Sequence, residues 1–122
     1  MRLWTLFSSI AICGAFAVTA CGPSGQVGDW RSQQIAAAEA KIRADVGDPS
    51  AQFSKVQLTG DDKTGQTCGE VQPAHNGSRR FIVYIDATAG PYIEGGAGGA
   101  PIGQDAFDSA WQNDCLAEGY SQ

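Results

Sequence analysis

The chain has 122 residues and a formal net charge of −5, and these two values bound the kinds of protein it can be. The length fits one domain, so a multidomain enzyme, a long solenoid and a coiled coil are excluded by size or composition. With 43% apolar and 17% charged residues, the chain has the composition of a folded domain. Nucleic acid is not expected as a partner, because binding phosphate requires a basic face and only Arg79 and Arg80 form a basic pair.

An uncharged and mostly apolar run from Leu3 to Ala20 follows the basic residue Arg2. A short basic region, an apolar run and small residues at its end are typical of a secretory signal peptide. The run ends in Val-Thr-Ala before Cys21, which resembles the lipobox of bacterial lipoproteins. In that family the cysteine receives a diacylglyceryl group and signal peptidase II cleaves before it. The resemblance implies cleavage between Ala20 and Cys21, with Cys21 as the lipidated first residue.

Residues 1–20 are therefore predicted to be a signal peptide, residues 21–28 a lipidated tether and residues 29–122 a single domain. Two acyl chains, at about 0.8 kcal/mol per buried CH2, would anchor the protein stably, and an amide-linked third, such as palmitate, would add to this. The residue after Cys21 is Gly22 and not aspartate, which favours the periplasmic side of the outer membrane by analogy with enterobacterial sorting. Two alternatives stay open: an uncleaved helical anchor, and cleavage by signal peptidase I that leaves Cys21 as a plain thiol.

Residues 29–46 have the periodicity of an amphipathic helix. Gly47, followed by Asp48 and Pro49, predicts its end. The polar face has too few basic residues for a helix that lies on a membrane surface, so we expect this helix to lie on a sheet. Its apolar stripe consists of Ile35, Ala38, Ile42 and Val46.

Three or four strands are predicted next, separated by segments rich in turn-forming residues. Alternation in the first strand is imperfect, which indicates a bulge. The third strand carries apolar residues on both of its sides and is therefore expected to be central. The strands cover residues 51–59, 67–72, 79–86 and, as a short edge strand, 92–94, and the glycines of residues 95–99 are expected to form a flexible loop.

The last segment, residues 104–118, is predicted to be a helix. Phe107, Trp111 and Cys115 share one of its faces, so Cys115 is expected to point inward towards Cys68. The order of helix, strands and helix, with short turns between the strands, predicts an α+β fold: an antiparallel sheet of three or four strands covered by helices.

Four cysteines are present, and the sequence predicts different roles for them. Cys13 leaves with the leader and Cys21 takes lipid, which leaves Cys68 and Cys115 as an even pair. In an oxidising periplasm this pair is predicted to form a disulfide. The alternatives, a metal site, a redox site or a free thiol, are disfavoured because His75 is the only histidine and there is no Cys-x-x-Cys motif. No metal and no other cofactor is predicted.

Several segments together resemble a group of small exported bacterial proteins with a DPxSAxF segment, a CGxVN-type strand and a terminal Trp-x-x-x-Cys or Trp-x-x-Cys. This chain departs from the pattern at Gln72, where asparagine is common, and in a shorter segment after Asn76. The resemblance implies export and a disulfide, but no reaction. Because glycine has no side chain, Gly69 beside Cys68 is expected to relieve crowding around the predicted disulfide. The matching residues are Asp48 to Phe53, Cys68 to Val71, Asn76-Gly77, Phe81 to Tyr84, Trp111 and Cys115.

Three patterns invite a chemical interpretation and fall short of one. The glycines of residues 95–99 lack the Gly-Lys-Ser/Thr of a phosphate loop. Asp61 and Asp62 lack the other ligands of a calcium loop. The third pattern is His75, which could form a hydrolytic set with Ser78 and a carboxylate. No Gly-x-Ser-x-Gly elbow is present to support this set.

The sequence therefore favours a non-enzymatic periplasmic domain, anchored to a membrane by lipid, that binds an envelope protein or a cell-wall component. Arg79, Arg80 and Tyr92 are its candidate partner contacts. Two alternatives are a small periplasmic hydrolase that uses His75, and an inhibitor or immunity-type lipoprotein whose glycine loop inserts into a cell-wall enzyme.

Overall fold

The computed structural model describes residues 29–75, 77–87, 89–96 and 98–122. The predicted signal peptide, the tether and Cys21 lie outside these residues. The elements are α1 (Trp30–Val46), β1 (Gln52–Thr59), β2 (Gln66–Gln72), β3 (Arg79–Tyr84), β4 (Tyr92–Ile93), the short 3-10 helix η2 (Glu94–Gly96), α2 (Gln104–Ala110) and the π-helix η3 (Trp111–Leu116).

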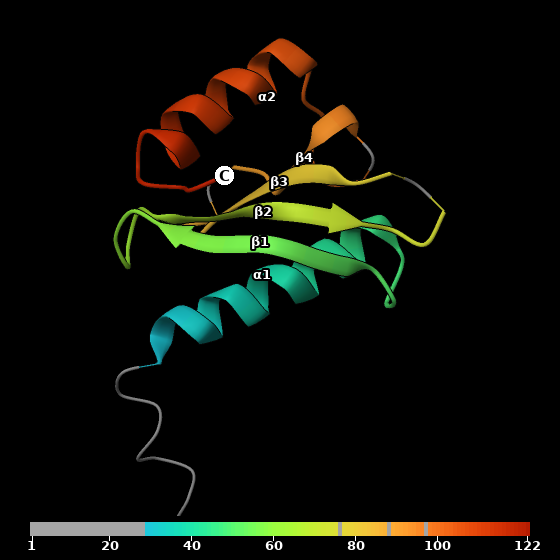
Figure 1. Cartoon of the computed structure of the whole chain (residues 1–122), viewed down its shortest axis with the longest axis horizontal. Coiled ribbons are helices and arrows are strands. Elements are labelled where there is room, and N and C mark those ends of the chain that lie inside the picture. Colours follow the sequence, from blue (N-terminus) through green and yellow to red (C-terminus); the bar gives the residue numbers. More distant parts are fainter. Residues whose placement is uncertain (1–28, 76, 88, 97) are drawn as a thin grey trace, which may run out of the picture.

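The four strands form one antiparallel sheet in the order β1-β2-β3-β4, so each strand pairs with its neighbour in sequence. Helix α1 covers one face of this sheet, and α2 with η3 covers the other (Figure 1). The predicted α+β architecture is confirmed, including the short fourth strand at the sheet edge, although this strand ends at Ile93 and Glu94 begins η2.

Helix α1 ends where the sequence predicts, because Gly47 adopts a left-handed backbone with a φ of 68°. Its N–H donates to the carbonyl oxygen of Ala44, and the N–H of Asp48 donates to that of Arg43. The buried part of the apolar stripe is shorter than the periodicity indicates: Ala38 and Ile42 are buried, whereas the ends of the stripe are only partly covered.

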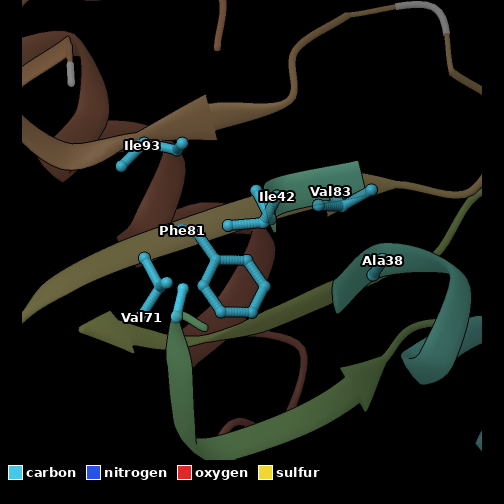
Figure 2. Packing of buried hydrophobic residues seen from close by; sticks show 7 residues of the cluster. Ala38, Ile42, Val71, Phe81, Val83 and Ile93 are labelled. Carbon is cyan, nitrogen blue, oxygen red and sulfur yellow. The ribbon is translucent and has the colours of Figure 1, made fainter. Parts of the chain in front are cut away.

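Strand β3 separates the two halves of the core. Phe81 and Val83 face α1, and Ile82, on the opposite face, packs under α2 and η3. The core on the α1 side contains Ala38, Ile42, Ala51, Val71, Phe81, Val83 and Ile93, most of which are labelled in Figure 2. The core on the α2 side contains Cys68, Ile82, Phe107, Trp111, Cys115 and Tyr120. The central position predicted for this strand is confirmed, although β3 ends at Tyr84 and not at Asp86.

Strand β1 contains the predicted bulge. Its pairing with β2 shifts register between Ser54 and Gln57, and Lys55 between them has a φ of 53°. A bulge leaves one residue without a ladder partner and bends the strand. The bend brings the backbone of Lys55 to the end of the chain, where the Tyr120 hydroxyl donates to the Lys55 carbonyl oxygen at 2.8 Å.

The C-terminal helix begins where predicted, at Gln104, but it ends at Leu116 and not at Glu118, and it changes type. It is α-helical to Ala110 and continues as a π-helix, in which the N–H of Ala117 donates five residues back to Gln112. The carbonyl oxygen of Asp114 accepts hydrogen bonds from the side chains of Thr59, at 3.1 Å, and Gln66. These side-chain bonds attach the π-helical turn to the sheet.

Cys68 on β2 and Cys115 on η3 form the predicted disulfide, and both residues are fully buried. Their sequence separation is 47. In the chain-entropy model, closing a loop of this length stabilises the folded state by about 4 kcal/mol. The bridge fixes the second helical layer to the sheet.

Gly69 has a different role from the one expected beside Cys68. A Cβ atom at this position would lie 3.0 Å from the Phe81 ring and 3.0 Å from the Val56 Cα. The glycine therefore leaves room for the Phe81 ring on the α1 side of the sheet, because neighbouring strand residues point to opposite faces.

We expect Gly69→Ala to lower the free energy of unfolding by about 1–3 kcal/mol, because the added methyl overpacks the core against Phe81. Gly77→Ala is the matched control, since a Cβ atom there meets nothing within 4 Å. Urea denaturation of both variants measures the difference. Equal stability of the two variants would contradict this account of Gly69.

Candidate partner-contact site around Arg80

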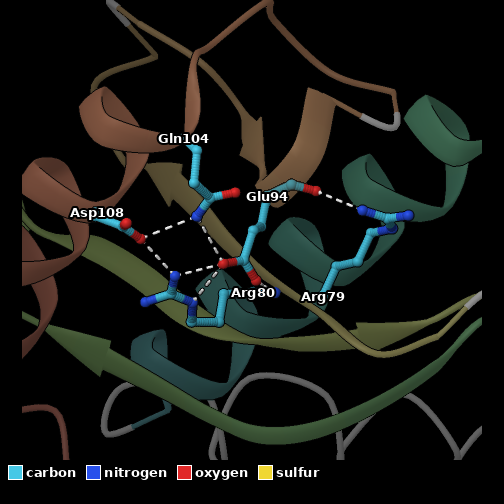
Figure 3. Close-up of polar contacts among 5 residues, drawn as sticks. All are labelled: Arg79, Arg80, Glu94, Gln104 and Asp108. Carbon is cyan, nitrogen blue, oxygen red and sulfur yellow. Dashed lines mark hydrogen bonds and ion pairs between the residues drawn. The ribbon is translucent and has the colours of Figure 1, made fainter.

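The three candidate partner contacts lie on adjacent strands. Arg79 and Arg80 are on β3, and Tyr92 on β4 pairs with Ile82. Because consecutive residues in a strand point to opposite faces, the two arginines separate. Figure 3 shows the Arg80 side chain directed to α2 and the Arg79 side chain directed the other way.

Arg80 is the centre of an ion-pair cluster (Figure 3). Its Nη2 atom pairs with Glu94 and, at 2.6 Å, with Oδ1 of Asp108, and its Nε donates to Glu94 at 3.2 Å. The Gln104 amide donates to both carboxylates, at 2.9 Å to Glu94 and 3.0 Å to Asp108. The cluster therefore connects β3, η2 and α2.

The same guanidinium group lies against the aromatic part of the core. Its Cζ atom is 5.2 Å from the ring centroids of both Phe107 and Trp111. Cations are attracted to the faces of aromatic rings at this range. Arg80 therefore joins the core on the α2 side to the ion-pair cluster above it.

The hydrogen bonds from Arg80 lower the pKa of Glu94 from 4.5 to about 2, against an opposing effect of burial. The same pairing raises the pKa of Arg80. The Glu94 side chain is 25% exposed, so the pairing is partly screened by solvent.

Arg79 and Tyr92 have separate surroundings. Nη1 of Arg79 donates to the Glu94 carbonyl oxygen at 3.2 Å. Gly95, with a φ of 79°, leaves the space for this group, because a Cβ atom there would lie 2.3 Å from Arg79 Nη1. The half-buried Tyr92 ring contacts the Tyr84 ring edge-on, with centroids 6.1 Å apart.

Sequence reasoning did not identify Glu94, Gln104 and Asp108 as the partners of Arg80. A signal was present, since Gln104 and Asp108 are four residues apart and share one face of a helix. Glu94 carries no such pattern, because its position opposite Arg80 depends on how β4 pairs with β3.

In the structure, two glycines of the predicted loop allow neighbouring backbone segments to lie very close to each other. A Cβ atom would lie 2.6 Å from the Asp45 carbonyl oxygen if added at Gly98, and 2.6 Å from the Pro91 carbonyl oxygen if added at Gly99. Both glycines also have positive φ values, 89° and 72°. Packing therefore accounts for these residues without a phosphate ligand.

His75 is exposed and lines a shallow pocket with Asp48 and Ser50. The Ser50 hydroxyl donates to the Asp48 carboxylate at 2.6 Å, and the other carboxylate oxygen accepts the Ala74 N–H at 2.8 Å. These bonds lower the pKa of Asp48, with the Ser50 hydroxyl as the largest cause. Among the described residues, no hydrogen bond joins His75 to Ser78. Asp48 thus ties the end of α1 to the turn after β2.

Within residues 29–75, 77–87, 89–96 and 98–122, no group of three or more His, Cys, Asp or Glu side chains is arranged to hold a metal ion. No helix within those ranges combines the length and apolar character needed to cross a membrane.

Comparisons with protein-family models, with curated proteins and with solved structures found no match for this chain.

The ion pair between Glu94 and Arg80 predicts that the free energy of unfolding decreases in acid. A folded-state pKa of about 2, below the ordinary 4.5, means that the pair stabilises the fold above the ordinary pKa. That stability is lost as the pH falls through the folded-state pKa. We expect the pair to contribute about 1–2 kcal/mol after solvent screening.

Urea denaturation of the natural protein and of Glu94→Gln at pH values between about 5 and 2 tests this expectation. The difference in unfolding free energy between the two proteins should shrink as the pH falls. Glu118→Gln, at an exposed position outside the cluster, is the control and should give a difference that does not vary with pH. A pH-independent difference for Glu94→Gln would refute the prediction.

Proposed function

We propose that this chain is an exported, lipid-anchored module of a bacterial envelope that binds an envelope protein or cell-wall component and catalyses no reaction. The observation that carries the proposal is the fully buried disulfide between Cys68 and Cys115. Structural disulfides form and persist in oxidising compartments such as the periplasm. An exported domain of this size gains a large part of its net stability from such a bridge.

The anchor is proposed from the sequence of residues 1–28. The Val-Thr-Ala-Cys segment that ends at Cys21 resembles a lipobox, and residues 22–28 are rich in glycine. A short tether of this composition would hold the domain near the membrane surface. We place the protein on the periplasmic side of the outer membrane, because Gly22 follows the cysteine.

A binding function is favoured over catalysis by the surroundings of the polar side chains. The Ser50 hydroxyl donates to the Asp48 carboxylate, whose lowered pKa makes it a weak base for activating a nucleophile. The carboxylates of Glu94 and Asp108 are paired with Arg80. Groups held in this way position elements of the fold and are poorly suited to proton transfer.

Intact-mass analysis of the protein purified from the membrane fraction tests export and anchoring together. We expect residues 1–20 to be absent, the mass of two or three acyl chains to be present, and two hydrogens to be missing from the remaining thiols. Cys21→Ser should abolish the added lipid mass while the Cys68–Cys115 bridge persists. Recovery of a soluble chain with its start methionine and alkylatable thiols would overturn the proposal.

Crosslinking in intact cells tests the binding function. We expect an envelope component to be recovered with the natural protein and to decrease several-fold with Arg79→Gln, because Arg79 is one of the candidate contacts. Arg31→Gln, at an exposed position on α1, is the matched control and should leave recovery unchanged. Equal recovery with both variants would argue against a contact at Arg79, and recovery of no envelope component would argue against binding.

A further inference from the structure

The outer face of α1 differs from that of an ordinary surface helix. A helix that packs on a sheet buries one apolar face and usually turns charged side chains to solvent. The inner face of α1 packs on the sheet through Ala38 and Ile42. Small residues alone identify no occupant for the outer face, so the features at its two ends decide. The alanines exposed on α1 are Ala36, Ala37, Ala40 and Ala44.

An apolar groove lies at the end of this face next to Gly47. Its volume is about 390 Å³, and its walls are almost entirely apolar. Arg43 is the charged residue of the lining, and its guanidinium lies over the Phe53 ring, with Cζ 4.7 Å from the ring centroid. The groove therefore suits an apolar group. The lining residues are Ala40, Arg43, Ala44, Gly47 and Pro49.

Trp30 lies at the opposite end of α1 and is its first residue. Its side chain is half-buried and belongs to neither of the two core clusters of the described residues. Trp30, Ala37 and Ala44 follow one another at intervals of seven residues, so they lie along one side of the helix. The Arg31 guanidinium lies over the indole, with Cζ 4.7 Å from the ring centroid. Tryptophan is enriched at membrane–water interfaces, because its ring is apolar and its N–H is polar.

The predicted anchor would bring this helix to a bilayer. Only seven residues, 22–28, separate the predicted lipidated cysteine from the N-cap of α1. A chain of seven residues spans at most about 25 Å, so the start of α1 would stay close to the lipid surface. A short link of this kind gives an effective concentration in the millimolar range. A contact that is weak by itself is therefore sufficient.

The charges near this face balance, which makes the contact apolar in character. Attraction to anionic lipid drives the binding of basic interfacial helices, and α1 lacks the excess of cations for it. We therefore expect that salt does not weaken the contact. The cations of α1 are Arg31, Lys41 and Arg43, and the anions of α1 and its N-cap are Asp29, Glu39 and Asp45.

We propose that the outer face of α1 lies on the lipid surface to which the chain is anchored. Trp30 is then at the level of the headgroups, and the groove beside Gly47 contacts the upper parts of acyl chains. The layer of α2 and η3, on the other side of the sheet, faces away from the bilayer (Figure 1). The inference rests on the proposed lipid anchor and gives the anchored domain an orientation.

Quenching of tryptophan fluorescence by brominated lipid tests the proposal. The anchored protein is purified from membranes and reconstituted in phosphatidylcholine vesicles that carry bromine either near the headgroup or near the end of the acyl chains. The signal that Trp30→Phe removes belongs to Trp30. We expect bromine near the headgroup to reduce this signal about twofold, bromine near the chain ends to reduce it less, and added salt to change neither result. Trp111 is 3% exposed on the other side of the sheet and should not be quenched.

Ala40→Glu tests the outer face directly. The variant places a charge at the middle of the face, and a charge moved from water towards hydrocarbon costs free energy. We expect the quenching of Trp30 to fall several-fold, with an unchanged midpoint of urea denaturation. Ala106→Glu, at an exposed position on α2, is the matched control and should be quenched as the natural protein is.

The outcomes separate this inference from the anchor on which it rests. Absence of Trp30 quenching in a protein whose intact mass includes acyl chains would overturn the contact and leave the anchor standing. Absence of acyl chains would overturn the anchor and the contact with it. Equal quenching in Ala40→Glu and Ala106→Glu would also overturn the contact. Sedimentation in detergent detects a further alternative: a dimer that Ala40→Glu dissociates, without quenching in vesicles, would assign the face to a second copy of the chain.

Discussion

Strand β3 carries fully buried apolar side chains on both of its faces, Phe81 on one and Ile82 on the other. A sheet with two apolar faces needs a cover on each, and this requirement produces the three layers of the fold. Helix α1 covers one face through Ala38 and Ile42. The other cover is held to the sheet by a covalent bond, the disulfide between β2 and η3.

The position of the Arg80 ion-pair cluster follows from where the helical layers meet the sheet. The residue before Phe81 is Arg80, which must face the second cover and therefore meets α2 and η2. There it pairs with Glu94 and Asp108 while its guanidinium lies on Phe107 and Trp111. One arginine thus connects the aromatic core to the surface. A small cleft lined by Arg80 and Lys55 lies beside this same cluster, next to the bulge of β1.

Some expectations needed only local physics, and others depended on contacts between distant residues. The end of α1 at Gly47, the bulge in β1 and the inward face of Phe107, Trp111 and Cys115 follow from propensity and periodicity, and the structure confirms them. Gly69 was assigned to the wrong neighbour, because its contact with Phe81 is made across two strands. The carboxylates that pair with Arg80 were missed for the same reason, since they are 14 and 28 residues away.

The sequence by itself determined the elements, their order and the pairing of Cys68 with Cys115, because helix and strand periods are local and the other two cysteines fall in the predicted leader and lipobox. The tertiary structure decided what surrounds each polar side chain. Arg79 and Arg80 are adjacent in the chain yet lie on opposite faces of the sheet, Lys55 is held by a tyrosine 65 residues away, and the indole of Trp111 is buried beside a cleft. Register, bulge and helix docking set these environments, and they depend on contacts that sequence spacing does not encode.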